Sequence, residues 1–231
     1  MQFILAAMLV VGISGCQSTG EKDVKLETKQ DKVSYSIGLT VGNNLKRDSI
    51  TISPEAFLRG VLDARVDSAQ RVMTEKEVQE TMTAFQQEMQ TKAQEREQAQ
   101  ALKSRTEGEA FLASNAKAPG IQVMPSGLQC RVITEGTGPK PQASSTVKVH
   151  YRGRLVDGTE FDSSFKRGEP AVFPVNGVIP GWTEALQLMK VGSKWEVFIP
   201  SHLAYGEQGA GGVIPPNATL IFEVELLEIQ K

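Results

Sequence analysis

The segment VKVHYRGRLVDGTEFDSS, residues 147–164, decides the fold of the second half of the chain. Val147, Val149 and Tyr151 alternate with two polar residues, Lys148 and His150, so the segment predicts a strand with one apolar face. Its end, FDSS, places an acid beside two hydroxyl groups, which raises the question of a hydrolase. These groups either react with a substrate or form one wall of a binding site.

Two later segments repeat the alternation, SKWEVFI at 193–199 and LIFEVEL at 220–226. One short helix is expected before them, from about Trp182 to Met189. Several antiparallel strands around a single short helix predict an α+β domain, which we assign to residues 120–231.

The first half of the chain shows helical periodicity instead. From Asp31 an apolar residue recurs at every fourth position, which predicts an amphipathic helix whose stripe is Val33, Ile37, Val41 and Leu45. Ser53-Pro54, a cap followed by proline at the first helical position, predicts a second helix. The capping box from Thr74 to Glu77 predicts a third helix of about 40 residues, about 60 Å long.

This third helix has almost nothing to bury between Gln90 and Gln100, so we predict that it runs through solvent between two bodies. Disorder is the alternative, but the composition favours helix throughout. The apolar faces before it are too few for an independent monomeric core. We therefore predict a homodimer in which residues 31–89 are a helical dimerisation domain and residues 90–119 are a stalk and linker.

The N-terminus, MQFILAAMLVVGISGC, is too short an apolar run to span a bilayer as a mature helix, and suits a signal peptide at residues 1–16. Its end resembles the bacterial lipobox, which predicts a lipid on Cys16 and attachment to a membrane. A plain signal peptide with an accidental cysteine is the alternative. Residues 17–30 are polar and are expected to form a tether. Gln17, in place of Asp after the cysteine, resembles the signal for sorting to the outer membrane. We therefore expect an outer-membrane lipoprotein that faces the periplasm, with exposure at the cell surface as the alternative.

Composition and residue counts exclude several classes of function. A net charge of −2 and a pI near 5.8 argue against nucleic-acid binding. No G-x-S-x-G motif surrounds the FDSS serines, so a nucleophile is not indicated. The two histidines and Cys130, which we expect to be a buried structural thiol, are too dispersed to form a metal site, and no cofactor is expected. The run GEQGAGG at 206–212 lacks the ending of a phosphate loop and predicts a flexible flap.

Four motifs in order resemble the FKBP-type peptidyl-prolyl cis-trans isomerases: VHYRGRLVDGTEFDSSFKRG, VIPGW, LAYG and VIPPNATLIFEVELLEI. The segment SYSIG at 34–38, with the helices around it, resembles the N-terminal dimerisation domain of the macrophage infectivity potentiator branch of that family. The resemblance implies a prolyl isomerase with additional chaperone activity on unfolded or proline-containing polypeptides. A catalytically weak FKBP-like module that only binds its clients is the alternative.

The resemblance also implies the residues of a proline pocket. The Ile179 N–H and the Tyr205 hydroxyl would hold substrate carbonyls, and Asp162 would lie at the pocket edge, bonded to Tyr151 or facing the twisted amide. Trp182 would be the floor. The binding walls would be Tyr151, Phe161, Phe173, Val178, Trp182, Ile214 and Phe222. Ala171 stands where the human-type pattern has an aromatic residue, which bears on the affinity for macrolide inhibitors more than on activity. The FDSS serines are expected to cap the turn after their strand.

Overall fold

The computed structural model describes residues 24–230. They fall into two compact units, one up to Val78 and one from Gln79 onward, and each is described by itself. Cys16, the predicted lipid attachment, lies outside the described residues. Within them, no helix is both long enough and apolar enough to cross a membrane.

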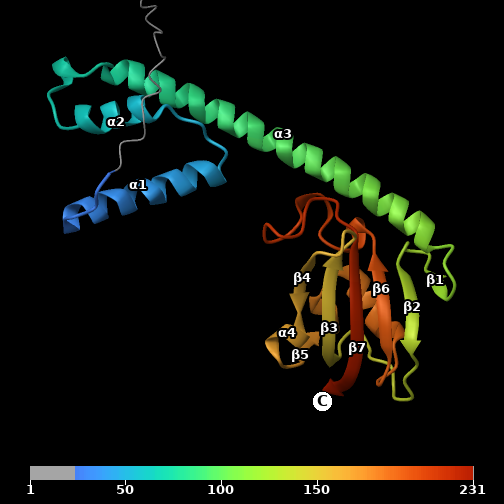
Figure 1. The fold of residues 1–231 in the computed structure, drawn as a ribbon. Helices are drawn as coiled ribbons and strands as arrows, with labels where there is room; N and C mark the ends of the chain where they lie inside the picture. The colour runs from blue at the N-terminus through green and yellow to red at the C-terminus, as the bar shows by residue number, and fades with distance from the viewer. Residues whose placement is uncertain (1–23, 231) are drawn as a thin grey trace, which may run out of the picture. The chain divides into compact units, whose positions relative to one another are not determined.

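The first unit is helical (Figure 1). Each of its α-helices begins at a side-chain cap. Helix α1 (Lys29–Arg47) starts behind a capping box at Thr28, and α2 (Pro54–Asp63) starts behind Ser53, whose hydroxyl accepts a backbone N–H. A 3₁₀ turn, η1 (Ser68–Gln70), follows α2. The predicted starts of the second and third helices are confirmed, and the first begins two residues before Asp31.

Much of the apolar stripes of this unit is exposed to solvent in the single chain, although Val41 and Leu45 of α1 are half-buried. Helix α1 contains no buried residue, and its Val33 and Ile37 are 48% and 60% exposed. Phe57 and Val61 of α2 are 45% and 46% exposed. These side chains therefore contribute little hydrophobic stabilisation within one chain.

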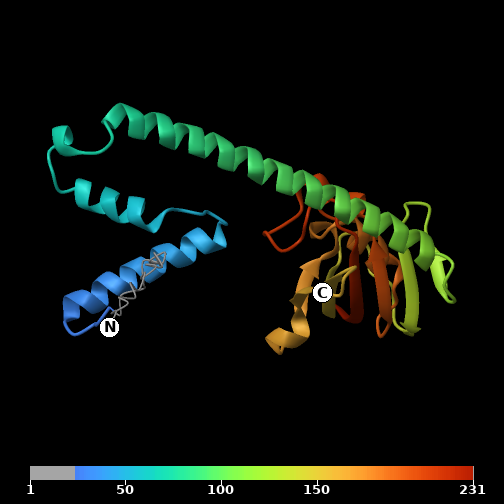
Figure 2. The same cartoon turned by 45° about the horizontal axis from the view of Figure 1, so that its top comes forward.

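Helix α3 (Glu75–Asn115) is one continuous helix of 41 residues, which confirms the prediction of an unbroken third helix. Its last turns belong to the second unit and pack against the β-sheet of that unit (Figure 2). Gly108 is buried against Thr219, and a Cβ at that position would lie 2.4 Å from the Thr219 hydroxyl oxygen. The ring of Phe111 lies 5.8 Å from that of Phe198, and the Gln129 side chain donates a 2.9 Å hydrogen bond to a main-chain carbonyl in the last turn. A side chain at position 108 would therefore force Thr219 to shift, which favours glycine at this close approach.

The second unit is built on one antiparallel sheet of seven strands. The strand order is β1-β2-β6-β7-β3-β4, with β5 also paired to β3. The strands are β1 (Ile121–Val123), β2 (Gln129–Thr134), β3 (Thr146–Leu155), β4 (Glu160–Ser163), β5 (Ala171–Pro174), β6 (Lys194–Ile199) and β7 (Leu220–Gln230). The central pairing of β3 with β7 joins the two segments with the clearest alternation (Figure 1).

Helix α5 (Pro180–Leu188) packs on the apolar face of this sheet. Its buried residues Trp182, Ala185 and Leu186 share one core with the inward residues of β3, β6 and β7. The predicted α+β class is confirmed, as is the inward direction of the alternating apolar residues.

The sequence did not indicate a second, four-residue helix in this unit, α4 (Ser164–Arg167), which follows β4 directly. Ser163 caps its start, and Gly168 ends it with a left-handed backbone conformation at φ 80°. Four residues form a single turn, which is too short to produce a periodic pattern in the sequence. Three 3₁₀ turns complete the unit: η2 (Val175–Gly177), η3 (Ser201–Leu203) and η4 (Gly206–Gln208).

Candidate active site

An aromatic cluster marks one end of the core. Trp182, in the first turn of α5, is 5% exposed, and Pro180 at the first helical position sets the start of that turn. Its indole meets Tyr151, Phe173 and Phe222 edge-on, at centroid distances of 5.2, 5.7 and 5.2 Å. These rings come from β3, β5, α5 and β7, so the site depends on the whole sheet being formed.

The cluster forms the floor of an open hollow of about 620 Å³. All ten residues that the sequence placed in a proline pocket line it: Tyr151, Phe161, Asp162, Phe173, Val178, Ile179, Trp182, Tyr205, Ile214 and Phe222. Four lining residues were not predicted: Gly177, Ala210, Gly211 and Val213. A largely apolar concave site with few polar groups is typical of a ligand pocket.

Gly153, in the middle of β3, lets two walls of the hollow meet. A Cβ at this position would lie 2.6 Å from the Phe222 ring and 2.7 Å from the Phe161 ring. The two rings therefore contact edge-to-face with their centroids 5.5 Å apart. A glycine inside a strand often marks such a close approach, and this was the available signal in the sequence.

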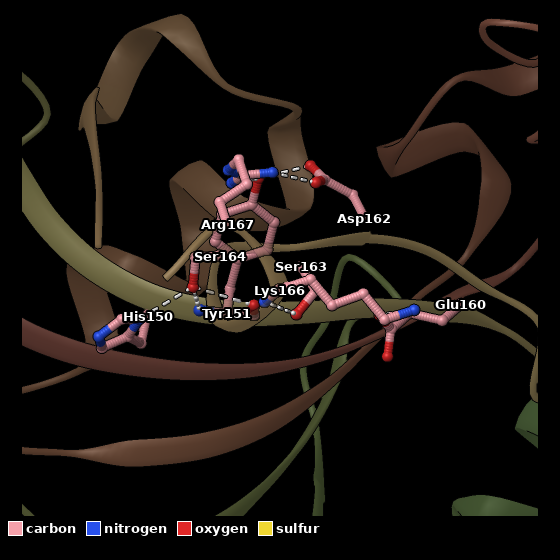
Figure 3. Close-up of polar contacts among 8 residues, drawn as sticks. All are labelled: His150, Tyr151, Glu160, Asp162, Ser163, Ser164, Lys166 and Arg167. Carbon is pink, nitrogen blue, oxygen red and sulfur yellow. Dashed lines mark hydrogen bonds and ion pairs between the residues drawn. The ribbon is translucent and has the colours of Figure 1, made fainter. Parts of the chain in front are cut away.

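A polar network lies at the rim (Figure 3). The Tyr151 hydroxyl donates a hydrogen bond to the Asp162 carboxylate, which also accepts one from the Arg167 guanidinium. Arg167 donates a second bond to the Tyr151 hydroxyl oxygen at 2.8 Å and lies over the Tyr151 ring. The bond between Asp162 and Tyr151 is one of the two alternatives that were predicted for Asp162. Arg167 was not predicted, because its side chain reaches Asp162, five positions earlier, only after α4 has formed.

This network fixes the ionisation of both acidic groups. Burial raises the pKa of the Asp162 carboxyl, but the hydrogen bonds from Tyr151 and Arg167 together with the Arg167 charge outweigh it, so the pKa lies below its ordinary value. Burial, followed by the hydrogen bond to Asp162, raises the pKa of the Tyr151 hydroxyl. At neutral pH Asp162 is therefore a carboxylate and Tyr151 remains a donor.

The two serines of FDSS have structural partners. The Ser163 hydroxyl accepts the Lys166 backbone N–H and caps α4, as predicted. Ser164 is fully buried, and its hydroxyl accepts the Tyr151 backbone N–H at 2.8 Å and lies 3.0 Å from His150 Nδ1 (Figure 3). The contact of Ser164 with His150 therefore holds α4 against β3. Because Ser164 is buried, its hydroxyl is not accessible to a substrate.

Two hydrogen-bond donors at the hollow are unused by the protein. Among the residues that the structure describes, neither the Ile179 N–H nor the Tyr205 hydroxyl donates to a protein acceptor. Tyr205 is 41% exposed and stands where the flap begins. The flap, residues 206–214, turns through glycines with positive φ and returns Ile214 to the hollow, where it is 7% exposed. The site thus offers two free donors above an apolar floor.

Comparison with known proteins gives matches over nearly the whole chain. The family model described as FKBP-type peptidyl-prolyl cis-trans isomerase matches residues 138–227, and the model of the domain amino terminal to such isomerases matches residues 30–132. The outer membrane protein MIP of Legionella longbeachae is 44% identical, over all of this chain and 98% of its own length.

A 22 kDa FKBP-type isomerase of Escherichia coli is 49% identical, over 88% of this chain and 97% of its own length. The crystal structure of FkpA from Escherichia coli superimposes with a TM-score of 0.73 at 36% identity, covering 88% of this chain and 98% of that one.

Proposed function

From the premise that this chain belongs to the family of FKBP-type peptidyl-prolyl cis-trans isomerases, we propose that its aromatic hollow binds the proline of a polypeptide and accelerates rotation about the preceding amide. The observation that carries the proposal is the pair of unused donors, Ile179 N–H and Tyr205 hydroxyl, above the Trp182 floor. The donors hold carbonyl groups of the chain while the floor holds the proline ring.

This arrangement needs no nucleophile. The barrier to rotation, about 18–20 kcal/mol, arises from amide resonance, which is lost as the bond twists. A twisted amide is less polar than a planar one and its nitrogen becomes pyramidal. A dry aromatic hollow therefore binds the twisted form better than the planar form, which is the condition for catalysis by differential binding. Asp162, held as a carboxylate at the rim, adds a fixed charge beside the rotating group.

The test is an isomerisation assay on a short proline peptide with the variants Asp162→Ala and Tyr205→Phe. Each is expected to lower kcat/KM at least about fivefold, the equivalent of one hydrogen bond of about 1 kcal/mol. Tyr35→Phe removes a hydroxyl from an exposed tyrosine of α1 and is the matched control. Wild-type efficiency in both site variants would refute the site. A wild type that binds the proline peptide but does not isomerise it would favour the alternative, a module that only binds its clients.

We further propose that the chain is a homodimer through α1, α2 and the first turns of α3. The exposed apolar side chains of α1 and α2, and Met82 of α3, which is 47% exposed, support this, because a second copy would bury them. Met82→Glu with Phe85→Glu should lower the sedimentation mass to that of a monomer. Ala84→Glu with Gln87→Glu places the same charges on the opposite face of α3 and should leave the dimer intact. A wild type that sediments as a monomer would defeat the dimer.

A membrane location and a chaperone role complete the proposal. The lipobox-like end at Cys16 and the name of the Legionella relative, outer membrane protein MIP, support attachment to the outer membrane facing the periplasm. Two pockets in one dimer would give an unfolded chain two points of attachment, which raises its overall affinity. The monomeric variant should then protect an aggregating client less well than the wild type, and equal protection would exclude this role for the dimer.

A further inference from the structure

A second hollow, of about 620 Å³, lies directly beside the proline pocket. Its walls are the flap, from Gln208 to Gly212 and at Ile214, the two prolines that follow, and the middle of α3 at Glu97 and Gln100. Three flap residues, Ala210, Gly211 and Ile214, line both hollows, so the two adjoin at the flap. A third, adjoining hollow extends along the same helix and is lined by Gln94, Glu97, Gln98, Ala101, Glu207, Pro216 and Asn217.

We propose that this helix–flap groove is a substrate subsite, which binds the extended residues that flank the proline in a polypeptide. The inference rests on the proposed function, since it assigns a second part of the same substrate to a surface that adjoins the pocket at the flap. From Gln94 to Ala101 the helix advances about 10 Å, which is the length of about three residues of extended chain.

The groove has a fixed wall. Helix α3 is held to the sheet by Gly108 against Thr219 and by the contact of the Phe111 and Phe198 rings. Nearer the groove, Arg105 forms an ion pair with Glu207 at 3.6 Å. A subsite built on a packed helix is already in place before the substrate arrives, so less ordering is required on binding.

The chemistry of the walls selects the occupant. Side-chain amides, which Gln100 and Gln208 contribute, can donate to and accept from the main chain of an extended peptide. Glu97 is exposed and has no ion pair among the residues that the structure describes. Because Glu207 is already paired with Arg105, Glu97 supplies the net charge of the groove. The subsite therefore takes a polypeptide that carries lysine or arginine near its proline.

The test compares two peptides that share one leucyl-proline bond, flanked on both sides by lysines in one and by glutamates in the other. At low salt the kcat/KM of the wild type should be about twofold to fivefold higher for the lysine peptide than for the glutamate peptide. This ratio corresponds to the free energy of one exposed charge pair. Glu97→Lys with Gln100→Lys should reverse this preference. Glu95→Lys with Ala99→Lys adds the same charge on the opposite face of α3 and should keep it.

Loss of the preference in 1 M salt is also expected, because exposed charges are screened there. An unchanged preference in the Glu97 and Gln100 variant would overturn the subsite. An equal change in the Glu95 and Ala99 control would also overturn it, since the effect would then come from the general charge of the helix. A wild type that isomerises neither charged peptide nor an unflanked short one would instead contradict the proposed function.

Discussion

The Trp182→Ala substitution should destabilise the isomerase domain while leaving the rest of the chain folded. The indole is 5% exposed and contacts three aromatic rings, and replacing a buried tryptophan by alanine costs about 3–5 kcal/mol. Its Nε1–H has no hydrogen-bond partner within the described residues, so no hydrogen bond is lost. The space left would open to the hollow and fill with water, which places the expected loss near 3 kcal/mol.

Urea denaturation followed by tryptophan fluorescence measures this loss. Both tryptophans, Trp182 and Trp195, lie in the second unit, so the signal reports that unit alone, and Trp195 remains in the variant. With a denaturant slope of about 2 kcal/mol per molar urea, the midpoint should fall by about 1.5 M. Trp182→Phe keeps a ring on the floor and should cost less than half as much. A midpoint lowered by under about 0.5 M in Trp182→Ala would refute the packed floor.

Three other changes test separate features. Arg167→Met removes interactions that hold the pKa of Asp162 below its ordinary value. The wild-type carboxylate contributes stability above its unfolded-state pKa and loses it as pH falls through the lower folded-state pKa, so the variant should be less stable at neutral pH and should lose less stability on acidification. A carboxyl titration by NMR that does not move would contradict the network. Gly108→Ala should cost a net of about 1 kcal/mol in urea denaturation, because the overlap with Thr219 exceeds the gain in helix propensity. Thr219→Ala should restore part of that loss, whereas strict additivity of the two changes would argue against the overlap. Cys16→Ser should release the protein from membrane fractions, and its retention there would place the anchor elsewhere.

The walls of the hollow that come from strands could be predicted because their residues follow the alternating pattern of those strands. Tyr151 and Phe222 alternate with core residues, so the strand pattern alone directs both rings inward. Their assignment to a pocket, rather than to the core, came from the resemblance of four motifs taken together. The starts of α2 and α3 were predictable for a different reason, since a capping side chain acts on backbone groups within three residues of itself.

Features that depend on tertiary contact could not be predicted. Arg167 reaches Asp162 only through α4, a single helical turn without a periodic signal. The docking of α3 depends on Gly108 meeting Thr219, more than 100 residues away along the chain, and the sequence of a polar helix gives no indication of which face will be covered. The helix–flap groove follows from that docking and could not be predicted without it.

Cys130 has a consequence for the redox chemistry of the protein. The thiol is fully buried in β2, and burial, with a smaller contribution from the Glu184 charge, raises its pKa to about 11. The thiolate is the form that attacks oxidants and disulfides, and at pH 7 only about one molecule in ten thousand would carry it. Thiol reagents should therefore modify Cys130 only as the domain unfolds. In an oxidising compartment, the lifetime of the reduced protein is then set by its rate of unfolding and not by the surrounding redox potential.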